Sequence, residues 1–84
     1  MKPIRLSEHA RAQLRFRGGF GSEVEEAIRT SAWEPAERGR LECRRNFPFH
    51  REWNGIVYAA KQVRPIFVDE PEEIVIVTVY VYYL

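Results

Sequence analysis

One set of polar side chains in this 84-residue sequence carries groups that can transfer protons or hold negative charge. A histidine near the start, two cations in the middle and two hydroxyl-bearing residues near the end make up this set: His9, Lys61, Arg64, Thr78 and Tyr80. Such groups can cleave an RNA phosphodiester bond without a metal. A base takes the 2′-hydroxyl proton, cations stabilise the charge on phosphorus, and an acid protonates the leaving oxygen. These residues, together with the basic and aromatic residues described below, could support this chemistry, which needs no cofactor.

A purely structural role is the alternative for each of these side chains. His9 then caps or packs a helix, Lys61 is a solvated surface cation, and Tyr80 covers the edge of a sheet. Both interpretations stay open on the residues alone.

A second set of basic and aromatic residues is suited to binding the RNA. The net charge is only +1, but residues 1–20 carry five Lys or Arg against one acid, and residues 41–64 carry five against two. Residues 65–84 carry four acids and no Lys or Arg. If the basic segments share a face, that face attracts phosphate, and a tyrosine there can stack on unpaired bases. The candidate RNA-binding residues are Arg11, Arg15, Arg17, Arg44, Arg45 and Tyr82.

Other chemistries find less support in the residue spacing. His9 and His50 are far apart, and the sequence has no Cys-x-x-Cys or His-x-x-x-His pair, so no metal site is predicted. The single cysteine, Cys43, cannot form an internal disulfide and is typical of a small buried hydrophobe. The acidic clusters at residues 23–26 and 69–73 fall at a helix start and in a turn, which disfavours paired-acid catalysis.

Two short helices are predicted in the first third of the chain. Ser7 is a plausible N-cap for a helix over residues 7–16, and the glycines from Gly18 onward end it. The pattern Ser22-x-x-Glu25 predicts a capping box and a second helix over residues 23–31.

From residue 38 onward the pattern predicts strands. Alternation over residues 41–47 indicates a half-buried strand that Pro48 ends, and residues 56–61 resume after an Asn-Gly turn. Because Pro65 cannot donate to a ladder, residues 66–68 are expected to form an edge strand or a new strand.

Residues 74–83 give the strongest strand signal, being nearly all β-branched or aromatic. Strict alternation puts the four valines on one face, toward the helices: Val75, Val77, Val79 and Val81. Ile74, Ile76, Thr78, Tyr80 and Tyr82 then share the other face, whose hydroxyl tips indicate an approach to water or a ligand.

Several motifs together resemble a small bacterial family, domain of unknown function 4258. The motifs are Ser7-Glu8-His9-Ala10, Arg17-Gly18-Gly19, residues 23–28 (EVEEAI), residues 61–67 (KQVRPIF) and Thr78-Val79-Tyr80. That family is similar in fold to the RelE/BrnT-like toxins, in which two N-terminal helices pack on a twisted antiparallel sheet. The resemblance implies a metal-independent ribonuclease, often ribosome-dependent, that an antitoxin neutralises by wrapping the sheet face.

The resemblance also assigns roles to individual residues. His9 matches the histidine of the family's first helix, Lys61 and Arg64 match its middle-strand cations, and Thr78 and Tyr80 match its final-strand polar pair. It implies proton transfer by His9 or Tyr80, phosphate binding by Lys61 and Arg64, and positioning by Thr78.

The sequence as a whole predicts one α+β domain over residues 1–84, with two N-terminal helices packed on a RelE-like twisted antiparallel sheet of three to four strands. The expected function is a RelE/BrnT-like endoribonuclease toxin whose partners are RNA or a ribosome and an antitoxin. The alternative is a non-catalytic interaction module that binds a partner protein, or a second copy as a homodimer, through its last strand and sheet face. We expect a cytoplasmic location, since the sequence opens with no secretory signal. We expect no membrane partner, because the apolar stretch 74–84 falls short of the about 20 residues that span a bilayer.

Overall fold

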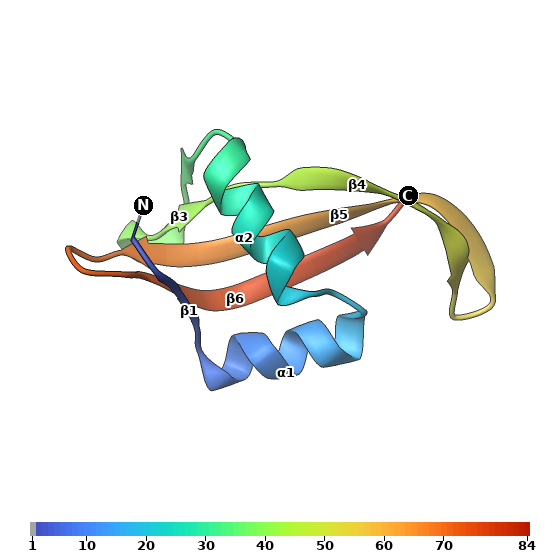
Figure 1. The fold of residues 1–84 in the computed structure, drawn as a ribbon, viewed down its shortest axis with the longest axis horizontal. Helices are drawn as coiled ribbons and strands as arrows, with labels where there is room; N and C mark the ends of the chain where they lie inside the picture. The colour runs from blue at the N-terminus through green and yellow to red at the C-terminus, as the bar shows by residue number, and fades with distance from the viewer. Residues whose placement is uncertain (1) are drawn as a thin grey trace.

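A computed structural model describes residues 2–84 of the chain. Within these residues, two helices and six strands make an α+β fold (Figure 1). In chain order the elements are β1 (Ile4–Leu6), α1 (Glu8–Arg17), α2 (Gly21–Thr30), β2 (Glu34–Pro35), the 3-10 turn η1 (Glu37–Gly39), β3 (Leu41–Glu42), β4 (Arg45–Trp53), β5 (Ile56–Asp69) and β6 (Ile74–Tyr83). Helix α2 lies across the sheet, while α1 runs alongside β6.

The sheet differs from the predicted one in strand number and direction. Its order is β1-β6-β5-β3-β2, with β4 also paired to β5, and β1 runs parallel to β6. The prediction of three to four antiparallel strands was therefore wrong. β1 and β2 have two or three residues each, too few for an alternating pattern to register, and only tertiary contact pairs them. The single strand predicted over residues 41–47 is divided into β3 and the start of β4, with residues 43–44 between them.

The helix ends show how local chemistry sets the first third of the fold. The Ser7 hydroxyl accepts the Ala10 N–H at 3.1 Å, and Gly18 ends α1 at a φ of 72°, so the predicted start and stop of α1 are confirmed. Helix α2 begins at Gly21, two residues earlier than predicted. The carboxylate of Glu23 caps it by accepting the Phe20 N–H at 2.9 Å, a role that the prediction gave to Ser22 and Glu25.

Neither proline interrupts its strand, contrary to prediction. β4 continues through Pro48 because the backbone N–H and C=O of its partner Ala60 both bond to Leu84 on the other side, so β5 offers Pro48 no acceptor. β5 also continues through Pro65, which lies opposite the junction between β3 and β4. No strand residue there requires a hydrogen bond from the missing N–H of Pro65, and the Pro65 C=O accepts the Cys43 N–H at 3.4 Å.

A bulge in β6 exchanges the two faces of that strand. Ile66 pairs with Thr78 but Phe67 pairs with Ile76, so Val77 is an extra residue. Ile74 and Ile76 therefore share the helix-covered face with Val79 and Val81, and the predicted placement of all four valines opposite the isoleucines was wrong. The core consists of Ala10, Leu14, Val24, Ala27, Ile28, Cys43, Val63, Phe67, Ile74, Ile76 and Val79.

Candidate functional site

The sheet separates the predicted catalytic residues into two groups. Directly paired residues of antiparallel strands lie on the same face, and the register pairs Arg64 with Tyr80 but Lys61 with Tyr83. Lys61 and Arg64 are three residues apart on one strand, so their side chains point to opposite faces. The sheet therefore does not bring Lys61 together with Arg64, Thr78 and Tyr80.

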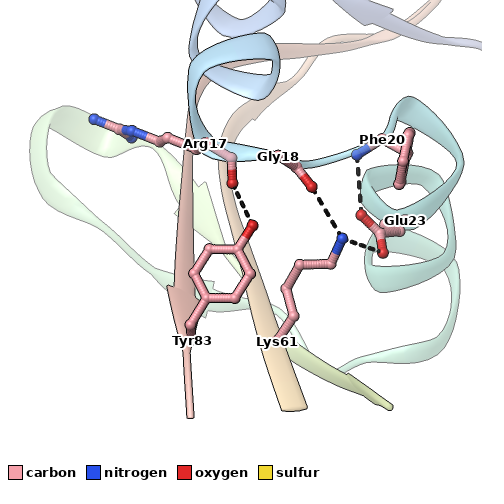
Figure 2. A network of polar contacts seen from close by, with 6 residues as sticks. All are labelled: Arg17, Gly18, Phe20, Glu23, Lys61 and Tyr83. Carbon is pink, nitrogen blue, oxygen red and sulfur yellow. Dashed lines mark hydrogen bonds and ion pairs between the residues drawn. The ribbon is translucent and has the colours of Figure 1, made fainter. Parts of the chain in front are cut away.

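Lys61 lies in a buried polar network beneath the turn between the helices (Figure 2). Its side chain is 2% exposed, and its ammonium donates to the Gly18 carbonyl at 3.0 Å and pairs with the Glu23 carboxylate at 2.9 Å. The rings of Phe20 and Phe49 lie 4.9 and 5.4 Å from the ammonium nitrogen. Because Lys61 is buried and its ammonium is held by Gly18 and Glu23, it joins the turn between the helices to β5.

Arg64 lies on the opposite face, which the helices leave uncovered, and is held by two neighbours. Its Nε donates to the Glu42 carboxylate at 2.6 Å, its Nη2 lies 2.5 Å from the same oxygen, and its Nη1 donates to the Tyr82 hydroxyl at 3.4 Å. The hydrogen bond to Glu42 is the main reason that the pKa of Arg64 is raised. This cation is therefore fixed in place on the open face.

Tyr80 lies next to two guanidinium groups from different elements. The carbon of the Arg64 guanidinium is 5.6 Å from the ring centroid of Tyr80, and that of Arg17 is 5.1 Å away. Arg17 comes from α1 and also donates to the Val79 carbonyl at 2.7 Å, so it reaches this ring past the edge of β6. Tyr82 is next along the same face, with its ring 6.3 Å from Tyr80 and nearly parallel to it. The open face thus combines cations with aromatic rings, as a single-stranded nucleic acid requires.

A hollow of about 650 Å³ opens beside this group. Its floor includes Ile66 and Thr78, and its far wall is the segment from β2 to β3. This segment contributes Arg38 and Arg40, which the sequence analysis did not select as site residues. A cluster of arginines from residue 38 onward was visible in the sequence, but only the pairing of β3 with β5 brings the cluster to Arg64.

The remaining predicted residues do not join this group. His9 is exposed on α1, and its side chain makes no hydrogen bond, ion pair or cation–π contact among residues 2–84. Arg11 and Arg15 line two other hollows beside α1, away from the group around Arg64. Arg45 lies on the helix-covered face, where it pairs with Glu26 at 3.2 Å. Arg44 is exposed at the junction of β3 and β4.

Residues 2–84 contain neither a cluster of metal ligands nor a membrane-spanning helix. No three His, Cys, Asp or Glu side chains gather there in a way that would hold a metal ion. In the same part of the chain, no helix is both long enough and apolar enough to cross a membrane.

Searches of protein-family models, curated proteins and solved structures return no match to this chain. The resemblance based on its motifs therefore stays a prediction.

Proposed function

We propose that the open face of the sheet binds single-stranded RNA and that the protein is a metal-independent endoribonuclease of the RelE-like class, the toxin of a toxin–antitoxin pair. The observation that carries the proposal is the group around Arg64, in which a fixed guanidinium, a second guanidinium and two tyrosines share one exposed face. Guanidinium groups bind phosphate oxygens, and exposed tyrosines stack on bases.

The same group supplies parts of the cleavage chemistry. Arg64, together with Arg17, would stabilise the negative charge that develops on phosphorus when the 2′-oxygen attacks, its proton passes to a water molecule and the bond from phosphorus to the 5′-oxygen breaks. The Tyr82 hydroxyl lies 3.4 Å from Arg64, so it is placed to give a proton to the leaving oxygen of a phosphate bound there. Thr78, on the floor of the hollow, would position the substrate. Lys61 has no part in this proposal because it is buried on the other face.

Cleavage of RNA by the purified protein in EDTA tests the proposal, with free RNA and translating ribosomes as substrates. Arg64→Gln is expected to lower the cleavage rate about a hundredfold or more, as loss of a charge-stabilising donor does. Tyr82→Phe removes only the hydroxyl and is expected to lower the rate by about a hundredfold. Both variants are checked by circular dichroism, since Arg64 also neutralises the largely buried Glu42.

Arg29→Gln is the matched control. It removes the same charge and an ion pair with Glu25, but on α2 rather than on the open face. If Arg64→Gln cleaves as fast as Arg29→Gln, the assignment of the site is wrong. If the wild-type protein neither binds nor cleaves RNA, the ribonuclease proposal fails and the protein-interaction module takes its place.

A further inference from the structure

We infer that the hollow between Arg64 and the segment from β2 to β3 is a pocket for one nucleotide, with the phosphate on Arg38 and Arg40 and the base on the floor of the sheet. The inference rests on the proposed function, because it names the unit of RNA that the open face would hold. It adds a site whose two cations come from outside the group around Arg64.

The charges around the hollow are unevenly neutralised. Arg64 gives two of its nitrogens to Glu42, so much of its charge is already balanced. Within residues 2–84, neither Arg38 nor Arg40 makes an ion pair or a side-chain hydrogen bond, and Glu37 is the remaining acid in the lining. The positive charge that no acid balances therefore lies on the segment wall, and a second phosphate, distinct from the scissile one at Arg64, is expected to bind there.

The backbone of this segment is held in a defined shape. The Ala36 N–H donates to the Arg40 carbonyl at 2.8 Å, and the Arg40 N–H donates to the Glu37 carbonyl at 3.2 Å. Arg38 has a φ of 60°, a left-handed conformation that an arginine seldom adopts. Such strain persists where the surrounding structure enforces it, and it is common at ligand sites.

The floor of the hollow suits a base. Ile66 and Pro35 supply apolar surface, Tyr80 supplies an aromatic ring, and Thr78 supplies one hydroxyl that both donates and accepts. A volume of about 650 Å³ is typical of small-molecule pockets and accommodates one nucleotide. Because a hydroxyl can satisfy either a donor or an acceptor on a base edge, the pocket is not expected to select one base strongly.

NMR titration of the full chain tests the inference with adenosine 5′-monophosphate, ribose 5-phosphate, inorganic phosphate and a three-nucleotide RNA as probes. The nucleotide should shift the backbone amide signals of residues 36–42, 64–66 and 78–80. It should bind about fivefold or more tightly than ribose 5-phosphate, which is the lower end of what one base contributes on a protein surface. Equal binding of nucleotide and inorganic phosphate would overturn the inference, as would shifts confined to other residues.

Variants of Arg38 and Arg40 test whether these two residues bind the phosphate. Arg38→Asn removes the guanidinium, yet asparagine tolerates the left-handed backbone, so the segment should keep its shape. We expect it to weaken nucleotide binding about tenfold, and Arg40→Gln to do the same. Arg29→Gln on α2 should leave the affinity unchanged. Wild-type affinity in both wall variants would contradict the assignment of the phosphate.

The outcomes for the pocket and for the ribonuclease are distinct. Cleavage of RNA without nucleotide binding in the hollow would overturn the pocket and leave the proposed function standing. Nucleotide binding in the hollow by a protein that neither binds nor cleaves RNA would support the pocket and contradict the proposed function. Tighter binding of the three-nucleotide RNA than of the mononucleotide identifies the polymer as the ligand, whereas the reverse order identifies a free nucleotide.

Discussion

At the scale of single residues, Lys61 shows how strongly a side chain's role depends on the face to which it points. A buried ammonium is stable only when it is paired and hydrogen-bonded, and Glu23, Gly18 and Phe20 supply those partners. Breaking such a pair from one side leaves the other charge buried without compensation. The side chain of Lys61 is 2% exposed and that of Glu23 is 15% exposed. Water can therefore solvate an unpaired Glu23 better than an unpaired Lys61.

Glu23→Gln is therefore expected to lower the free energy of unfolding by about 3 kcal/mol or more, and Lys61→Met by less. The double variant should lose less than the sum of the two single losses, because no unpaired charge remains. Urea denaturation measures all three. Purely additive losses would show that the pair is not coupled.

Where Lys61→Met stays folded, its RNA cleavage rate should match the wild type. A loss of cleavage in the folded variant would show that Lys61 belongs to the site.

At the scale of elements, α1 protects an exposed strand edge. Beyond β1, the outer edge of β6 has no neighbouring strand in the described part of the chain. Two side chains of α1 bind the backbone of Val79 there: the Gln13 amide oxygen accepts its N–H at 2.8 Å, and Arg17 donates to its C=O at 2.7 Å. An edge satisfied in this way does not template pairing with another chain.

Gln13→Ala/Arg17→Ala is expected to free both backbone groups of Val79 and so to promote self-association through β6. Sedimentation velocity over a range of concentrations should show dimers or larger species in the variant at concentrations where the wild type stays smaller. Arg11→Ala/Arg15→Ala, on another side of the same helix, is the control and should behave as the wild type does. An unchanged profile in the β6 variant would mean that the edge is protected by something other than α1.

At the scale of the whole molecule, the ionisable groups define a window of pH in which the fold is most stable. The hydrogen bond from Arg5 lowers the pKa of Glu73, so this exposed pair adds a small stabilisation above the ordinary glutamate pKa and loses it as the pH falls. Burial raises the pKa of Cys43 from 9.0 to about 11, and burial also raises that of Tyr83. Above pH 9 the unfolded chain loses the Cys43 proton more readily than the folded chain does, so stability falls as the pH rises.

The free energy of unfolding should thus decline between about pH 9 and pH 11, with Cys43 contributing about 2 to 3 kcal/mol by the upper limit. Denaturation of the wild type and of Cys43→Ala at pH 8 and pH 10.5 measures this contribution. Cys43→Ala creates a small cavity and is less stable at both values, but its decline with pH should be shallower. An equal decline in the two proteins would show that the thiol is not the group that titrates.

The local features of this protein were predictable from its sequence alone. Ser7 and Gly18 bound α1 as predicted, because caps depend on neighbours within a few residues. The β-branched and aromatic run from residue 74 onward forms a strand as predicted, and the α+β class follows from the order of such elements. Thr78, Tyr80 and Tyr82 share one face, as alternation within residues 78–82 predicts.

Features that depend on partners distant in the sequence are set by the tertiary structure. The bulge at Val77 exchanges the faces of β6, and its position is set by the register with β5 rather than by valine itself. Pro48 and Pro65 are tolerated because of which neighbouring backbone groups face them. Arg38 and Arg40 reach the site because β3 pairs with β5, while Lys61 leaves it because Glu23 and Gly18 hold it on the other face. Local propensity depends on neighbouring residues in the sequence. The register of a strand, and the face and partners of each side chain, depend on packing between elements.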